Sequence, residues 1–485
     1  MTRIEILGLT GLAMAKLAVH LATNATYGFH RDELYYLASG RHPALGYVDY
    51  PPLTPLLARF ELDLFGPSVF WLRLFPALAG VILVVLAGLI AAELGGGTFA
   101  RLAAATATLA CPLLLATNWL FQTVAFDQLA WMVALFMVAR LLRTGDGRWW
   151  LGVGVVLGVG LETKYTILAL CLGLAVGLLA TRRRDLVTPW PWLGALAALL
   201  LWAPNLAWQA THGWVSVQYI LQHPSNQASL FSPAAFLAGQ LAIGPLAVPL
   251  WLAGWFRLLR HREARLLGVA ALVAFGTFML VGKAYYAGPL YPLLLAGGAV
   301  ALDSVVRGRA GWLRPAAIVA VTLNGILLLP FLIPIVPTAK LHAYHLDSAR
   351  TDYADTVGWP GLVDQVAAVY DSLPAAERRD ATILASNYGE AGALDLYGPA
   401  RGLPPAISVH LTYYFWKPAH VDDRTVIVVG YSADDVSRYF ADVEPVASIT
   451  MPNGVSNEEV GQPILIARQP RVPLDQLWPQ MPHLN

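Results

Sequence analysis

Two acidic segments follow the first hydrophobic stretch of the chain. They are the triplet Arg31-Asp32-Glu33 and the segment Gly46-Tyr47-Val48-Asp49-Tyr50-Pro51-Pro52-Leu53. Acids that gather near a membrane surface are candidates for chemistry, because a carboxylate is costly there unless it is used. We expect Asp32 to act as a general base that takes a proton from an attacking hydroxyl, with Glu33 and Asp49 in the same catalytic group. The fixed φ angles of Pro51-Pro52 keep the preceding backbone extended and would aim Asp49 and Tyr50.

Cationic and hydroxyl side chains suited to a phosphate lie in other segments. The five lysines of the chain are Lys16, Lys164, Lys283, Lys340 and Lys417. A lysine inside or at the outer end of an apolar helix is costly unless it lines a wet cavity or meets an anion, although it can also snorkel to the interface. For Asp127, near the outer end of another apolar stretch, a metal, a substrate hydroxyl and a structural cation are all open. The substrate-binding candidates are Arg31, Tyr50, Asp127, Lys164, Tyr165, Lys283, Tyr285 and Tyr286.

Composition identifies the surroundings of these residues. The 485 residues are 57% hydrophobic and 13% charged, with a mean hydropathy of +0.55, which is far too apolar for a soluble domain of this size. A formal net charge of +1 gives no basis for nucleic-acid binding, and no phosphate loop or dinucleotide fingerprint is present. Cys111 and Cys171 lie in apolar runs, where thiols usually serve as packing residues. The chain is therefore expected to be a polytopic α-helical membrane protein.

Stretches long and apolar enough to cross a bilayer occur about eleven times. The first is expected to be retained as a helix rather than removed as a signal peptide. The stretches lie at 4 to 23, 69 to 93, 101 to 118, 124 to 142, 149 to 162, 165 to 180, 190 to 207, 235 to 256, 266 to 282, 289 to 306 and 315 to 337.

Basic residues predict the orientation, since cytoplasmic loops retain an excess of Lys and Arg. Fifteen arginines lie in one set of loops, including the Arg182-Arg183-Arg184 run, whereas the opposite set before residue 339 holds six basic residues. The N-terminus is therefore expected in the cytoplasm. The Asp32 loop, the 208 to 234 loop and everything after about residue 339 would then face outward.

The polar C-terminal part predicts a small extracytoplasmic α/β domain. Strands are expected at Thr382 to Ala385, Thr425 to Val429 and Pro463 to Ala467, with helices near 361 to 373 and 432 to 441. The segment Asn387 to Leu394 follows the first strand and could expose a helix N-terminus, but a structural role is favoured. The expected domains are 1–338, transmembrane and catalytic, and 339–485, extracytoplasmic.

Several of these segments resemble GT-C glycosyltransferases of the protein O-mannosyltransferase-like superfamily, which includes bacterial aminoarabinose transferases and rhizobial lipopolysaccharide glycosyltransferases. The resemblance is carried by Arg31 to Tyr36, Tyr47 to Leu53, Gly160 to Tyr165 and Lys283 to Pro292. It implies a GT-C fold and an inverting transfer from a polyprenyl-phosphate sugar, with Asp32 as the base and with or without a divalent metal ion. No other cofactor is expected.

One departure from the family pattern affects the phosphate site. The aminoarabinose transferases have Lys and Pro after the acid of the second segment, whereas Asp49 is followed by Tyr50 and Pro51. The resemblance therefore makes Lys164 the first choice for the donor phosphate. Metal ligands are not identified, and His212 and His223 are candidates only.

An outward-facing enzyme needs a donor delivered through the membrane, because nucleotide-activated sugars are cytoplasmic. We therefore expect a glycosyltransferase of the bacterial cytoplasmic membrane that contacts lipids and acts on an extracytoplasmic acceptor such as a cell-envelope glycan, lipid or protein. A lipid-linked glycan ligase is an alternative. A transporter is another alternative, although the repeated halves that it would predict are not found in the sequence. The sugar, the acceptor, the lipid length and the oligomeric state are left open.

Overall fold

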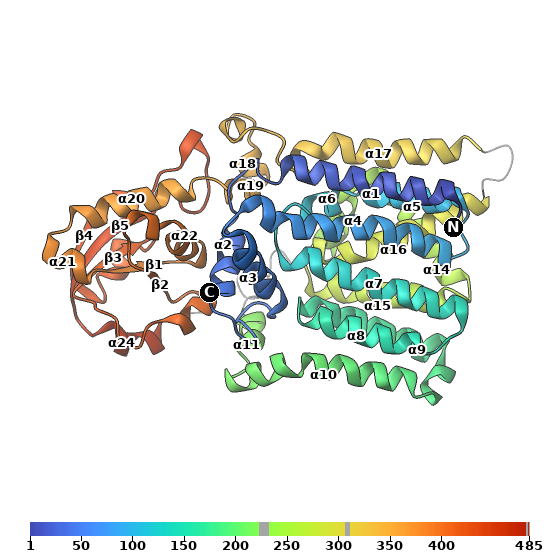
Figure 1. Ribbon diagram of the computed structural model, residues 1–485, viewed down its shortest axis with the longest axis horizontal. Helices are drawn as coiled ribbons and strands as arrows, with labels where there is room; N and C mark the ends of the chain where they lie inside the picture. The colour runs from blue at the N-terminus through green and yellow to red at the C-terminus, as the bar shows by residue number, and fades with distance from the viewer. Residues whose placement is uncertain (223–231, 306–310, 482–483, 485) are drawn as a thin grey trace.

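A computed structural model describes residues 1–222, 232–305, 311–481 and 484. A bundle of long helices carries an α/β domain at one end, and the N-terminus of the chain lies at the opposite end of the bundle (Figure 1). Short helices α2 (Arg31–Arg41), α3 (Leu53–Phe65) and α11 (Val215–Gln222) lie where the bundle meets the domain. The two acidic segments of the sequence are therefore at this junction.

Every stretch expected to cross the membrane contains helix. Within the described part of the chain, six helices are long and apolar enough to span, and two helical segments, Pro233–Ala242 and Pro245–Arg260, form a pair bent by 89°. Three further apolar helices are shorter. The expected count of about eleven spans is not confirmed by these criteria. The helices are α1 (Arg3–Thr23), α4 (Val69–Glu93), α5 (Thr98–Leu109), α6 (Pro112–Thr117), α7 (Thr123–Thr144), α8 (Trp149–Leu161), α9 (Leu168–Thr181), α10 (Trp190–Thr211), α13 (Pro233–Ile243), α14 (Val248–Arg260), α15 (Arg265–Val281), α16 (Tyr291–Val305) and α17 (Leu313–Leu332).

Small residues let the helices pack closely, as is usual in membranes. A Cβ on Gly154 of α8 would lie 1.9 Å from the carbonyl oxygen of Gly194 on α10, and a Cβ on Gly254 of α14 would lie 1.9 Å from that of Leu294 on α16. Exposed apolar side chains cover the outer helices. In the most apolar 18-residue stretch of α10 only 22% is buried, whereas 78% is buried in the corresponding stretch of Ala284–Ser304. The bundle therefore has packed central helices and an apolar surface suited to lipid.

The C-terminal domain has a five-stranded sheet in its described part, in the order β2-β1-β3-β5-β4. Strands β2, β1 and β3 are parallel, and β5 is antiparallel to both β3 and β4. Buried apolar residues of α20 (Trp359–Ser372) and α22 (Tyr388–Tyr397) form one core with one face of the sheet and with α2. The bundle and the domain are thus joined through a shared core. The strands are β1 (Thr382–Ala385), β2 (Ala406–Ser408), β3 (Thr425–Val429), β4 (Phe440–Ser448) and β5 (Pro463–Pro470).

The sequence-based assignment of this domain was correct for the most apolar elements. The three expected strands correspond to β1, β3 and β5, and the helix expected near 361 to 373 corresponds to α20. The helix expected at 432 to 441 was wrong. Only α23 (Ala433–Val436) is helical, because the chain from Phe440 onward pairs with β5 as strand β4. Tertiary pairing overrides local helical preference here.

Candidate active site

The first turn of α2 sets the position of Asp32. His30 is the N-cap residue of α2. Its ring accepts a hydrogen bond from the backbone N–H of Asp32 over 3.1 Å, and its backbone N–H donates to the carboxylate of Glu33 over 2.8 Å. This reciprocal arrangement is a capping box with histidine in place of the usual hydroxyl residue. The local sequence therefore fixes the start of the helix that presents Asp32.

Glu33 anchors α2 to the bundle. Its carboxylate accepts two hydrogen bonds from Arg73 of α4, at 2.9 and 2.8 Å, and one from the backbone N–H of Phe121 at 2.9 Å. Both side chains of the Glu33–Arg73 pair are fully buried. With the N–H of His30 the carboxylate accepts four hydrogen bonds, so this geometry favours a positioning role for Glu33 over the catalytic role expected from the sequence.

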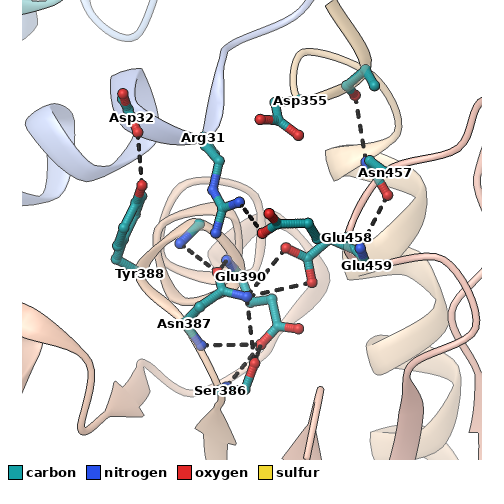
Figure 2. A network of polar contacts seen from close by, with 12 residues as sticks. Arg31, Asp32, Asp355, Ser386, Asn387, Tyr388, Glu390, Asn457, Glu458 and Glu459 are labelled. Carbon is teal, nitrogen blue, oxygen red and sulfur yellow. Dashed lines mark hydrogen bonds and ion pairs between the residues drawn. The ribbon is translucent and has the colours of Figure 1, made fainter. Parts of the chain in front are cut away.

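Asp32 lies between the bundle and the C-terminal domain. One carboxylate oxygen accepts a hydrogen bond from the hydroxyl of Tyr388 over 2.9 Å (Figure 2). The other accepts one from the side-chain amide of Gln122, also over 2.9 Å. The side chain is 30% exposed. Burial and the negative charge of Asp32 hold the pKa of Tyr388 well above its usual value, so its hydroxyl stays protonated and donates. Asp32 is thus an oriented and accessible carboxylate.

Asp49 lies near Asp32 in a network of tyrosines. It accepts a hydrogen bond from Tyr35 of α2 over 3.2 Å. The hydroxyl of Tyr35 in turn accepts the backbone N–H of Thr412, which belongs to the C-terminal domain, over 3.0 Å. Burial raises the pKa of Asp49 to about 7, and the negative charge of Asp32 acts in the same direction. Asp49 is therefore an acid whose charge changes near neutral pH.

Two lysines approach the same region from the bundle. Lys164 lies within electrostatic range of Asp127, Lys283 and Asp32, and its Nζ is 5.5 Å from the ring centroid of Tyr285 and 5.2 Å from that of Tyr286. Neither Lys164 nor Lys283 has a carboxylate within ion-pair distance among the described residues. Two half-buried like charges without an ion-pair partner form a place where an anion would be stabilised.

Asp127 is a buried acid within electrostatic range of Lys164. Its oxygens accept hydrogen bonds from the indole N–H of Trp131 over 3.1 Å and from the hydroxyl of Thr166 over 2.9 Å. Of the roles that the sequence left open, this arrangement favours a counter-charge that orients Lys164.

Three of the expected substrate-binding residues make polar contacts within the protein. The hydroxyl of Tyr165 donates to Asn205 of α10 over 2.9 Å, and that of Tyr50 lies 2.7 Å from the hydroxyl of Ser39. Arg31 pairs with Glu458 over 2.6 Å and its guanidinium lies 5.1 Å from the ring centroid of Tyr388 (Figure 2). These contacts favour holding the loop and the C-terminal domain in place over binding substrate.

Tyr388 and Gln122 are the neighbours of Asp32 that the sequence did not reveal. Tyr388 is 356 positions from Asp32, and its ring stacks on Tyr35 with centroids 4.7 Å apart. The signal that could have found it is Asn387, which caps α22 through hydrogen bonds from Gly389 and Glu390 and so fixes the residue that follows it. Gln122 precedes α7 and carried no comparable signal.

The described residues do not fit a divalent metal site. Among them, no three His, Cys, Asp or Glu side chains are grouped as ligands. The ring of His212 stacks on Trp208 with centroids 4.0 Å apart, and its Nδ1 lies 2.8 Å from the carbonyl oxygen of Trp208. His223, the other candidate from the sequence, lies outside the described residues.

Comparison with known proteins relates this geometry to a family. Residues 49–208 match the family model described as dolichyl-phosphate-mannose-protein mannosyltransferase. No curated protein sequence matches the chain. The segment matched by the family model includes Asp49, Asp127 and Lys164.

Solved structures match over most of the chain. The crystal structure of ArnT from Cupriavidus metallidurans bound to undecaprenyl phosphate has a TM-score of 0.59 and 16% identity, covering 95% of this chain and 97% of that one. An oligosaccharyltransferase from Archaeoglobus fulgidus, tethered with an acceptor peptide, has a TM-score of 0.51 and 14% identity, covering 83% of this chain and 64% of that one. The chain therefore has the fold of these solved structures, the GT-C fold, and its residues 49–208 are similar in sequence to the mannosyltransferase family.

Proposed function

We propose that the chain is an integral membrane glycosyltransferase that moves a sugar from a polyprenyl-phosphate donor to an extracytoplasmic acceptor, with inversion at the anomeric carbon. The observation that carries the proposal is the presence of Asp32 within electrostatic range of Lys164, which itself lies near Lys283. A base for an acceptor hydroxyl and cations for a leaving phosphate are the groups that this transfer requires. The match to an ArnT structure bound to undecaprenyl phosphate supports the donor class.

Asp32 is the proposed base. Both of its hydrogen bonds come from neutral donors, Tyr388 and Gln122, so the carboxylate is oriented while retaining lone pairs for an incoming hydroxyl. In the proposed step the acceptor hydroxyl gives its proton to Asp32 while its oxygen bonds to the anomeric carbon. The bond between that carbon and the phosphate oxygen breaks, and the electron pair leaves with the polyprenyl phosphate.

Lys164 and Lys283 are the proposed partners of the departing phosphate. Negative charge grows on the phosphate oxygen as its bond to the sugar breaks, so cations placed there stabilise the transition state more than the bound donor. Asp127 is a counter-charge within electrostatic range of Lys164, and the rings of Tyr285 and Tyr286 lie beside the lysine. Asp49 contributes a second carboxylate that takes up a proton as the pH falls toward neutrality.

The orientation of the site is part of the proposal. The arginine-rich Arg182–Arg184 segment follows α9, and the arginines at 257 to 265 lie in the last turn of α14, in the turn after it and at the start of α15, at the bundle end opposite the C-terminal domain (Figure 1). By the positive-inside rule that end faces the cytoplasm, so Asp32 and the C-terminal domain face outward.

The test replaces Asp32 by Asn in a deletion strain and follows cell-envelope glycans by mass spectrometry. Loss of a proton acceptor in the chemical step should lower transfer by roughly a hundredfold or more, while purified Asp32→Asn still binds undecaprenyl phosphate. The matched control is Asp63→Asn, an exposed acid of α3 that pairs with Arg59 outside the site. Envelope glycans unchanged by Asp32→Asn would remove Asp32 from the mechanism, and glycans unchanged by the deletion itself would contradict the proposed function.

A further inference from the structure

A cavity of about 370 Å³ lies in the C-terminal domain, away from the lysines of the bundle. Ser386 and Asn387 follow β1, His410 follows β2, and Tyr431 follows β3, and all four line it. The cavity is therefore at the carboxyl ends of the three parallel strands.

Sheet topology explains why a cavity forms there. Strand β1 connects through α22 to β2 on one side, whereas β3, on the other side of β1, leads away to β4 and β5. Connections that leave neighbouring strands in opposite directions open a crevice at the carboxyl ends, and ligands of open α/β sheets bind at such points. A volume in the range of a few hundred Å³ is also typical of small-molecule sites.

The start of α22 is closed to a phosphate. Asn387 Oδ1 accepts the N–H groups of Gly389 and Glu390 at 2.8 and 3.0 Å, and the Glu390 carboxylate accepts the N–H of Ser386 at 2.8 Å (Figure 2). Glu390 and Glu459 are both buried beside Asn387. The backbone donors that would hold a phosphate are thus occupied, and carboxylates behind them repel an anion.

The rest of the lining suits a neutral ring with hydroxyl groups. Leu384, Val436 and Phe440 form a buried apolar floor. The half-buried rings of Tyr431 and Tyr439 stand above the floor, and neither hydroxyl makes a hydrogen bond with another described residue. The exposed carboxylate of Asp435, which also lines the cavity, accepts a hydrogen bond from Ser432 over 2.7 Å and pairs with Arg438 of the lining over 3.4 Å, so these two charges are matched. Apolar side chains, tyrosine rings and a paired carboxylate and guanidinium are groups that recognise the faces and the hydroxyls of a sugar ring.

We propose that this cavity binds a neutral saccharide unit, and that the unit belongs to the non-reacting part of the acceptor. The assignment to the acceptor rests on the proposed function. The cavity wall leads directly to the base: Asn387 precedes Tyr388, which hydrogen-bonds to Asp32, and His410 stacks on the ring of Tyr388 with centroids 5.1 Å apart. A glycan held here would extend its next sugar toward the junction of the two domains.

The test uses the full chain in lipid nanodiscs and ligand-observed saturation-transfer NMR with methyl pyranosides, with adenosine monophosphate as the phosphate-bearing comparator. Wild type should transfer saturation to the pyranosides and not to the nucleotide. Asp435→Ala and Tyr431→Ala should each weaken pyranoside binding by about tenfold, the loss expected from one polar or one ring contact. Asp434→Ala is the matched control, because this exposed neighbouring acid does not line the cavity.

Binding in this experiment needs no transfer reaction, so it is independent of the proposed function. An active enzyme that gives no pyranoside signal overturns the cavity assignment and leaves the glycosyltransferase proposal intact. Equal binding by Asp435→Ala and Asp434→Ala, in samples with unchanged melting temperatures, also overturns it, as does displacement of the pyranoside by adenosine monophosphate. Should Tyr431→Ala fold poorly, the Asp435→Ala and Asp434→Ala pair alone decides.

Discussion

At the scale of the residue, Lys164 is the side chain whose role follows most directly from its surroundings. It carries a positive charge near Asp127, faces two tyrosine rings and has no ion-pair partner among the residues described. Lys164→Ala should weaken undecaprenyl-phosphate binding by roughly ten- to a hundredfold, since a hydrogen bond to a charged group contributes about 1.5 to 3 kcal/mol. Lys164→Arg should restore part of the affinity because the site needs charge, although the planar guanidinium has a different shape.

Binding of the labelled lipid phosphate to purified variants measures this effect. Lys340→Ala is the control, because Lys340 is exposed in the short helix Thr338–Lys340 after α17. An affinity of Lys164→Ala within about twofold of the parent would identify Lys164 as a snorkelling lysine and transfer the phosphate role to Lys283.

Asp49 gives the site a dependence on pH. Its pKa is raised by burial to about 7, so between the unfolded value of about 3.9 and 7 the folded state binds more protons than the unfolded state. Stability must then fall as the pH rises through this window. Asp49→Asn removes the buried charge, so its melting temperature should exceed that of the parent at pH 8 by more than it does at pH 5. Thermal unfolding in detergent at the two pH values measures the difference, and parallel curves for parent and variant would contradict it.

Single residues also show what the sequence could predict. Residue type and position relative to apolar stretches predict Asp32, Asp49, Asp127, Lys164 and Lys283 as site residues. In the structure, Lys164 lies within electrostatic range of Asp127, Lys283 and Asp32, and Asp49 lies within electrostatic range of Asp32. Glu33 was selected by the same reasoning, but its role depends on Arg73, which lies 40 positions away. Tyr388 was missed because hydrogen bonding to Asp32 depends on how two domains meet. The local sequence pattern identifies charged residues that are costly to place near a membrane, whereas the tertiary structure determines which residues become their partners.

At the scale of the element, α2 joins the two parts of the molecule. Its first turn holds Glu33 against Arg73 of the bundle, and the rest of the helix packs against α22 through the core that it shares with the C-terminal domain. A catalytic residue on such a helix is held more precisely than one on a free loop.

Glu33→Gln should therefore destabilise the protein strongly. The substitution leaves the Arg73 guanidinium buried without its counter-charge, and breaking a buried pair in this way typically costs about 3 to 5 kcal/mol. The expected result is a clear fall in melting temperature together with lower transfer, because α2 also positions Asp32. Asp63→Asn breaks an exposed pair on α3 and should change the melting temperature little. Equal melting temperatures for the Glu33 variant and the parent would show that the buried pair does not hold α2.

At the scale of the whole molecule, the order of parts along the chain supports the proposed orientation, in which each end of the bundle faces one side of the membrane. Helix α2, whose first turn carries Asp32, and the C-terminal domain lie at one end of the bundle, and the arginine-rich connections lie at the other (Figure 1). In the proposed orientation, a sugar donor linked to a membrane lipid would reach the outer end without passing through the protein. The distribution of charge along the bundle therefore agrees with the proposed place of the chemistry.

This arrangement predicts the topology that reporter fusions would measure. A reporter active only in the cytoplasm should work when joined at Gly145, in the turn between α7 and α8, because that turn lies among the cytoplasmic arginines. The same reporter joined after residue 485 should be inactive, and one active only outside should work there. The two fusion points serve as controls for each other, since the proposed orientation places them on opposite sides of the membrane. An active cytoplasmic reporter at the C-terminus would place Asp32 on the side where nucleotide sugars are available. The argument for a lipid-linked donor would then lose its basis, even with the local geometry of Asp32 unchanged.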